Sequence, residues 1–198
     1  MTMDQTRRGF LFATGTYAAG LSLVDGPEAF AQQLAPTPAC GGDDAPTVRQ
    51  TEGPFFKPRS PQRADLREAG TRGVSVELSG FVLTRGCRPV TGALVDLWHA
   101  DERGEYDNSG FRYRGHQMTD AAGRYRFRTI RPAVYVGRTA HYHVKVQGQG
   151  SRLLTTQLYF PDEPANRRDG LFRQELLMKL AAAGDGQAAR FDFVLDLR

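Results

Sequence analysis

The sequence predicts a mainly β protein, a β-sandwich of mixed or antiparallel strands with long loops and one short C-terminal helix. Short segments of alternating or continuous apolar residues recur along the chain, and turns rich in Gly and Pro separate them at regular intervals. A single segment has its apolar residues at helical spacing. With 198 residues, 40% of them hydrophobic, the chain is long enough for one globular domain with a substantial core.

The expected elements follow one another from residue 74 to the end of the chain. Apolar alternation or apolar runs predict strands in residues 74–84, 93–98, 119–127 (a turn followed by a strand), 139–147, 153–160 and 191–197. A helix is expected over Leu171–Ala183, where Gly184 provides the stop and the apolar residues have a helical spacing: Leu171, Phe172, Leu176, Leu177 and Leu180. Residues 57–73 are polar and rich in Pro and Gly, which predicts a loop.

The first 50 residues precede this domain. Thr6–Leu11 has the form of a twin-arginine signal, an apolar run follows from Phe10 to Val24, and Ala29–Ala31 offers a cleavage site. The alternative, a membrane anchor, fits less well because the apolar run is short and contains Gly, Ser and Thr. We therefore expect a signal peptide at 1–31, an extended arm at 32–50, a sandwich domain at 51–198, and export to the periplasm or outside the cell, with no membrane contact beyond export.

The charge does not favour a nucleic-acid partner. The formal net charge is +4, but the arginines are scattered and form no dense basic tract. A weak positive field of this kind is compatible with small anionic substrates.

The chain contains two cysteines, Cys40 and Cys87. Disulfides persist in exported proteins, so we expect these two to form a bridge that ties the arm to the domain. Closing that loop would contribute roughly 3–4 kcal/mol on the loop-entropy model. Two unpaired thiols are the alternative, and thiol counting without reductant separates the two.

The segment from Tyr135 to His143 carries the strongest chemical signal. Side chains that are two residues apart on a strand point to the same face, so His141 and His143 are expected side by side, as a metal-chelating pair requires. A pair of histidines on a solvated strand face is the alternative. Tyr106 and Tyr135 lie in expected loops, where sites are commonly built on a sandwich. Together these residues suggest a site with two phenolates and two imidazoles, and phenolate favours Fe(III) over softer divalent ions.

Five motifs in order resemble the intradiol ring-cleavage dioxygenases, the family of catechol 1,2- and protocatechuate 3,4-dioxygenases. They cover about 150 residues, and they are Thr51–Phe56, Gly92–Trp98 with Gly104–Tyr106, Thr119–Pro132, Arg138–His143 and Thr155–Phe160. The resemblance implies a non-haem Fe(III) dioxygenase that uses O₂ to open the ring of a small aromatic diol between its two hydroxylated carbons, giving a muconate-type diacid.

The resemblance also implies roles for individual residues. The iron ligands would be Tyr106, Tyr135, His141 and His143, with Tyr135 leaving the iron when substrate binds and acting as a base. Arg138 would be the catalytic arginine, Gln157 would face the substrate, and Gly53 and Pro54 would form a wall of the substrate site. His99, His116 and Asp96 match no ligand: His99 is expected at a strand end and His116 in a loop.

The chain departs from the family pattern between Tyr135 and Arg138, where many members have an insertion with pocket-lining aromatic residues. The helical dimerisation segment of catechol 1,2-dioxygenases is also missing, although a homo-oligomer is compatible with the sequence. A more open pocket that accepts several catechols is our hypothesis for this departure.

Three other interpretations compete with this one. A non-catalytic, transthyretin-like ligand-binding sandwich and a structural or adhesion-type domain both lack any need for two tyrosines and two histidines. A copper or zinc enzyme is the third, and phenolate ligation argues against zinc, which prefers nitrogen and sulfur donors.

Overall fold

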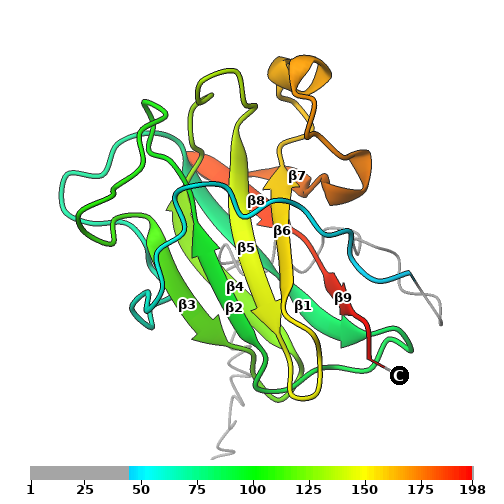
Figure 1. The fold of residues 1–198 in the computed structure, drawn as a ribbon. Helices are drawn as coiled ribbons and strands as arrows, with labels where there is room; N and C mark the ends of the chain where they lie inside the picture. The colour runs from blue at the N-terminus through cyan, green and yellow to red at the C-terminus, as the bar shows by residue number, and fades with distance from the viewer. Residues whose placement is uncertain (1–44, 198) are drawn as a thin grey trace, which may run out of the picture.

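Two β-sheets lie face to face in the computed structural model, which describes residues 45–197 (Figure 1). The four-stranded sheet is antiparallel throughout, with the order β3 (Arg114–Met118), β2 (Leu94–Trp98), β5 (His141–Gln147) and β6 (Leu154–Tyr159). This arrangement confirms the predicted β-sandwich.

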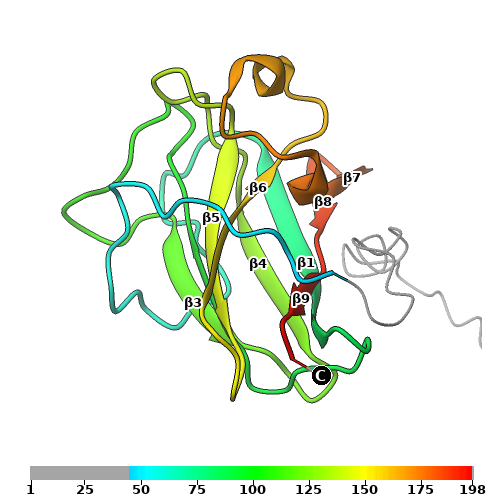
Figure 2. The same cartoon turned by 45° about the vertical axis from the view of Figure 1, so that its right-hand side comes forward.

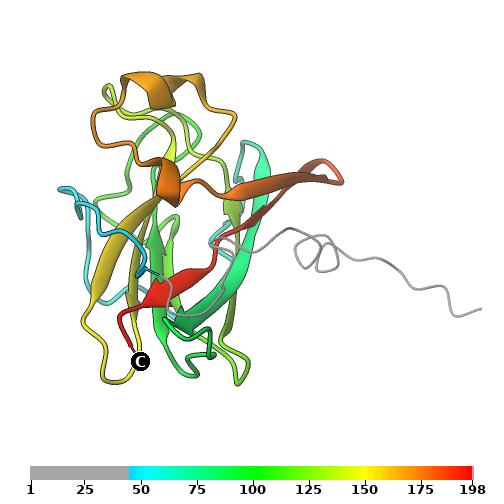
Figure 3. The same ribbon diagram turned by 90° about the vertical axis from the view of Figure 1, so that its right-hand side faces the viewer.

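The second sheet has five strands. Its order is β4 (Arg124–Ile130), β1 (Ser75–Thr84), β8 (Gly186–Arg190) and β7 (Lys179–Ala183), and β9 (Phe193–Leu195) also pairs with β1. The β1 strand is antiparallel to β4 but parallel to β8 and β9, so the sheet is mixed, as expected. Figure 3 shows the two layers from the side, with the hairpin of β7 and β8 extending beyond them.

The core lies between the sheets, and strand alternation determines which side chains reach it. In β5, Tyr142, Val144 and Val146 belong to the core cluster and are at most 1% exposed. His141 and His143 alternate with them and therefore point to the outer face of the four-stranded sheet. The chain thus places both imidazoles on one face of a strand whose other face is fixed by core packing.

The segment before β1 covers this outer face. In Figures 1 and 2 the chain that follows residue 45 crosses in front of β6 and β5. Its backbone is held by Gln50 N, which donates to Thr155 O at 2.9 Å, and by Thr51 O, which accepts from Gln157 Nε2 at 2.9 Å. The histidine face is therefore enclosed between a sheet and a covering segment.

The predicted helix over Leu171–Ala183 is wrong. The structure has a three-residue 3₁₀ turn at Gln174–Leu176 and the strand β7, while a second 3₁₀ turn covers Pro164–Arg168. The irregular chain path buries only some of the apolar residues: Leu176 is fully buried and Phe172 packs edge-on against Tyr159, whereas Leu171 is 36% exposed.

Strand β3 is a second difference from the sequence-based expectation, which places His116 in a loop. His116 instead pairs with Asp96 across β2 and β3, and the Ser60 hydroxyl lies between them, 2.8 Å from Asp96 Oδ1 and 3.1 Å from His116 Nδ1. This cluster gives Asp96 the structural partner that a carboxylate on an apolar strand requires.

Several sequence expectations fall on residues that the structure does not describe. These include the signal peptide at 1–31, most of the arm at 32–50, and Cys40. Cys87 is disulfide-bonded, but its pairing with Cys40 remains a prediction. Within residues 45–197, no helix has the length and apolar character needed to cross a membrane.

Candidate active site

His141 and His143 form the centre of the candidate site. Their Nε2 atoms lie 3.1 Å apart and both side chains are buried. His141 Nδ1 lies 2.6 Å from Thr139 O, and since a carbonyl only accepts, Nδ1 carries the proton and the neutral ring presents a lone pair at Nε2. Burial lowers the pKa of His141 to about 4 and that of His143 well below its ordinary value. Both imidazoles are therefore neutral near pH 7.

Tyr106 brings a third donor atom to the same point. Its hydroxyl lies 3.1 Å from His143 Nε2, and its ring stacks on Phe55 with centroids 4.3 Å apart. Burial raises the pKa of the phenol, while the charges of Arg138 and Arg114 act in the opposite direction. A phenol in this environment stays protonated near pH 7 unless a further positive charge binds beside it.

The loop around Tyr106 is held by its own polar groups. The carboxylate of Asp107 accepts the backbone N–H groups of Ser109 (3.0 Å), Gly110 (2.7 Å) and Arg112 (2.9 Å). Burial alone would raise the pKa of Asp107, but these hydrogen bonds outweigh it and lower the pKa to about 2. Lys57 Nζ donates to three carbonyls of the same loop. The tyrosine thus lies on a loop with a defined shape.

Tyr135 is less firmly held. Its ring meets Tyr106 and Phe55 edge-on, with centroids 5.5 and 5.3 Å apart, and its hydroxyl makes no hydrogen bond within the described part of the chain. The two tyrosines therefore differ: Tyr106 is anchored by stacking and by a hydrogen bond, whereas Tyr135 has ring contacts alone.

A tight turn links Tyr135 to Arg138. Tyr135 N donates to Arg138 O at 3.1 Å, and Arg138 N donates back to Tyr135 O. The two residues between them have positive φ, 33° at Val136 and 77° at Gly137, as in the turns that favour Asn-Gly. A β-branched residue in this region is strained, so the turn stores energy at Val136.

We expect Val136→Asn to raise the free energy of unfolding by about 0.5–1 kcal/mol, since asparagine tolerates the left-handed region that valine does not. Val136 is 84% exposed and little packing is lost. Chemical denaturation measures the gain. The neighbouring Val134→Asn, at a position without positive φ, is the matched control and should give no gain. Equal effects of the two variants would show that the turn carries no strain.

Arg138 joins the site to a buried carboxylate. Its Nη2 donates to Gln157 Oε1 at 2.6 Å, and its Nε lies 2.9 and 3.0 Å from the two oxygens of Asp169. Gln157 Nε2 in turn donates to Thr51 O. The guanidinium is therefore fixed at two points, and it connects β6, the covering segment and the loop that follows β6.

Asp169, whose side chain is 1% exposed, is a site residue that no sequence pattern indicates. It also accepts the N–H groups of Thr139 and Leu171. Burial would raise the pKa of Asp169, but the hydrogen bonds from Leu171, Arg138 and Thr139 outweigh burial and lower it. A lone aspartate in a polar loop gave no sequence signal. Two aromatic residues of the site also lack a sequence signal, Phe55 and Trp98. The Trp98 ring stacks on the His143 ring, with centroids 5.0 Å apart and an interplanar angle of 7°.

Gly53 lies against the histidine pair. Its φ is +70°, and a Cβ at this position would lie 3.2 Å from His143 Cε1 and 3.7 Å from Nε2. A residue without a side chain lets the backbone approach the imidazole this closely. Pro54 follows in the same loop and is exposed.

The donor set fits a metal ion. Two ligand atoms that bind one ion at about 2.1 Å and at right angles are separated by about 3 Å, close to the 3.1 Å contacts among the two Nε2 atoms and the Tyr106 hydroxyl. Within residues 45–197, no three His, Cys, Asp and Glu side chains form a metal-binding group, so an ion here would also depend on tyrosine oxygen. A hard phenolate oxygen beside neutral imidazoles suits Fe(III).

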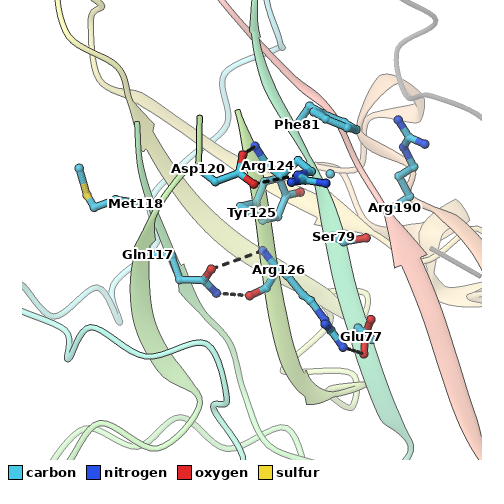
Figure 4. Close-up of a pocket in the computed structure, with 11 residues that line it drawn as sticks. Glu77, Ser79, Phe81, Gln117, Met118, Asp120, Arg124, Tyr125, Arg126 and Arg190 are labelled. Carbon is cyan, nitrogen blue, oxygen red and sulfur yellow. Dashed lines mark hydrogen bonds and ion pairs between the residues drawn. The ribbon is translucent and has the colours of Figure 1, made fainter. Parts of the chain in front are cut away.

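A separate cavity of about 420 Å³ lies on the five-stranded sheet, over β1 and β4 (Figure 4). Its three arginines are already paired: Arg124 with Asp120 at 2.8 Å, Arg126 with Glu77 at 2.7 Å and Arg190 with Asp192 at 3.2 Å. None of the four expected ligands lines it, so it is not the candidate site.

Comparisons with known proteins place the chain among dioxygenases. Residues 51–197 match the profile of the family described as "Dioxygenase". A solved dioxygenase domain, from a dioxygenase–carbohydrate-binding protein fusion of Streptomyces sp. SirexAA-E, is 52% identical; the match covers 78% of this chain and 100% of that one, with a TM-score of 0.76. The protocatechuate 3,4-dioxygenase beta chain of Burkholderia cepacia is 34% identical over 64% of this chain, and hydroxyquinol 1,2-dioxygenase of Rhizobium sp. (strain MTP-10005) is 31% identical over 70%. The match spans 65% and 56% of the lengths of these two relatives.

Proposed function

The chain belongs to the intradiol dioxygenase family, and from this membership we propose that it is a non-haem Fe(III) enzyme that cleaves the ring of catechol-type diols between the two hydroxylated carbons. The observation that carries the proposal is the convergence of His141 Nε2, His143 Nε2 and the Tyr106 hydroxyl at 3.1 Å contacts. A non-catalytic binding sandwich would have no reason to bury these three donors together.

The proposed iron ligands are His141, His143, Tyr106 and Tyr135. When bound, ferric iron would make the chelated diol reactive towards O₂. The two imidazoles need lose no proton to serve as ligands, because both are already neutral. Tyr106, with its stacked and hydrogen-bonded ring, is the fixed phenolate.

Tyr135 is the proposed proton acceptor. Its ring contacts alone leave it more able to move than Tyr106, and a released phenolate is a base that can take a hydroxyl proton from the incoming diol. Arg138 is the proposed charge stabiliser. A guanidinium that does not lose its proton, fixed by Asp169 and Gln157, can stabilise negative charge that develops on the substrate oxygen.

The activity is tested by supplying O₂ and a panel of diols (catechol, protocatechuate and hydroxyquinol) to the iron-loaded protein. We expect O₂ uptake and a ring-opened diacid in which ¹⁸O₂ labels both new oxygens. Turnover of several panel members supports the open pocket proposed from the short Tyr135–Arg138 connection. An aldehyde product from cleavage beside the hydroxyls, or no O₂ uptake with any diol by folded, iron-loaded protein, would contradict the proposal.

We expect Tyr135→Phe to bind iron but to slow substrate association by about 10²-fold or more, the usual contribution of a positioned base. The ring contacts to Tyr106 and Phe55 are retained, so the fold should not change. Stopped-flow mixing with catechol measures the rate. The control, Tyr113→Phe, removes a hydroxyl from another loop ring that stacks on His99. Wild-type association in Tyr135→Phe would remove Tyr135 from the role of base.

A further inference from the structure

Arg114, the first residue of β3, is one of the most deeply buried cations in residues 45–197, at 1% exposure. It pairs with Trp98 across β2 and β3, and Trp98 pairs with His143 on the other side. The three side chains therefore form one row across the site face of the sheet. A buried guanidinium is costly unless other groups compensate its charge and hydrogen bonds, and burial lowers the pKa of Arg114.

The compensation comes from backbone carbonyls. Arg114 Nη1 donates to Phe55 O at 2.6 Å and Nε donates to Asp107 O at 3.1 Å. The carboxylate of Asp107 is occupied by the N–H groups of its own turn and forms no ion pair with Arg114. Nη2 makes no hydrogen bond within the described residues. The guanidinium therefore contacts backbone carbonyls, while the carboxylates of Asp107 and Asp96 act on its charge from a distance without a direct ion pair.

The two carbonyls have Tyr106 in common. Asp107 follows Tyr106 directly in the chain, and the ring of Phe55 stacks on the ring of Tyr106. One side chain thus fixes both the backbone beside the tyrosine and the aromatic ring that lies on it. The covering segment and the Tyr106 loop, about 50 residues apart in sequence, are joined at this point.

We propose that Arg114 is a positioning residue for Tyr106, which sets the place of the phenol relative to His143 by clamping the Phe55 and Asp107 carbonyls. This inference deepens the proposed function and rests on it, because Tyr106 is a proposed iron ligand. Without the clamp, the Tyr106 loop would keep the hydrogen bonds of Asp107 and Lys57, but the Asp107 and Phe55 carbonyls would lose their tie to β3. The phenol oxygen would then lose its defined distance to the imidazoles.

The variants Arg114→Met and Arg114→Lys test the clamp, and Arg190→Met is the matched control. Arg190 is also buried, at 9% exposure, but it lies on β8 of the other sheet and pairs with Asp192. Both Arg114→Met and Arg190→Met should lower the melting temperature. Only Arg114→Met should change the position of Tyr106 in the site.

Two readouts separate a positioning role from a purely structural one. In metal-free protein, we expect amide hydrogen exchange of residues 107–112 to become about tenfold faster in Arg114→Met and to remain unchanged in Arg190→Met. In iron-loaded protein, we expect a shifted phenolate-to-iron absorption band and a loss of iron affinity of about 10- to 100-fold, the usual effect of removing a group that orients a ligand. Phe55→Leu should shift the same band.

Unchanged exchange and an unchanged band in folded Arg114→Met would overturn the inference, as would the same changes in Arg190→Met. If Arg114→Met does not fold, Arg114→Lys provides the test. A lysine can donate to the Phe55 or the Asp107 carbonyl but not to both, so we expect smaller changes in exchange and in the iron band. Wild-type exchange and a wild-type band in Arg114→Lys would contradict the clamp. A wild-type protein without an iron band would remove the proposed function, while the exchange experiment would still report on the clamp.

Discussion

His143→Ala should lose iron binding by more than about 100-fold, beyond the effect of removing a group that only orients a ligand, and with it all measurable ring cleavage. The substitution removes the imidazole that contacts both other donors, His141 Nε2 and the Tyr106 hydroxyl, at 3.1 Å. Iron retained after dialysis against a chelator gives the affinity loss. His143→Gln, which keeps most of the side-chain volume beside Trp98, separates ligand loss from a packing defect.

His116→Ala is the matched control for this prediction. His116 lies on β3 of the same sheet, and its Nδ1 contacts Ser60 rather than the site. It should retain iron and activity. A His143→Ala protein that keeps a full equivalent of iron would show that the ligand assignment is wrong.

Arg138→Met should keep its iron but lower kcat by about 10²–10³-fold, the effect of removing one positioned charge stabiliser. The substitution also leaves the buried Asp169 without its cation, so we expect the free energy of unfolding to fall by on the order of 3 kcal/mol. Steady-state kinetics with iron quantified in the same samples separates catalysis from ligation. Arg138→Lys should not restore kcat, because an ammonium cannot serve Asp169 and Gln157 with the same planar geometry.

Arg131→Met is the corresponding control. Arg131 has a similar exposure, 19%, and pairs with two carboxylates, Asp162 and Glu163, outside the site. It should lower stability without changing kcat. If Arg138→Met turns over within about threefold of the wild type while its iron is intact, Arg138 does not stabilise charge during the reaction.

The histidine pair could be predicted from the sequence because the cause is local. Alternation along one strand sends Tyr142 and Val144 into the core and the two histidines to the opposite face, whatever the remainder of the chain does. The tyrosines were different. Both lie in loops and no periodicity places them, so the sequence suggests them as partners of the histidines, and only the resemblance to a family assigns each its role as a ligand. Their positions depend on Phe55, which the covering segment supplies from a distant part of the sequence.

The incorrect helix has a physical reason. The helical spacing runs through Phe172, Leu176 and Leu180, but these residues are accommodated separately. Phe172 packs on Tyr159, Leu176 is fully buried, and Leu180 lies in β7, which pairs with β8. Helical periodicity indicates which apolar residues need burial, but a chain that wraps around another element can bury such residues without forming a helix. Strand β3 was missed for the opposite reason, since Arg114–Met118 has no apolar alternation and pairs through tertiary context.

The polar residues that orient the site were the hardest to predict. Asp169 and Arg114 are buried charges in segments that are polar in sequence, and nothing in their neighbours distinguishes them from surface residues. Their roles follow from contacts across the sheet and between loops, with Arg138 for Asp169 and with Phe55 O and Asp107 O for Arg114. Such contacts exist only after the sandwich has formed.

The visible absorption spectrum of the iron-loaded protein tests the central claim most directly, because it reports phenolate ligation itself. We predict a broad phenolate-to-iron(III) charge-transfer band that makes the protein wine-red, that shifts when catechol is added without O₂, and that disappears in His143→Ala. A folded protein that binds iron without such a band, or whose band does not respond to catechol, would contradict a site built from Tyr106, Tyr135, His141 and His143.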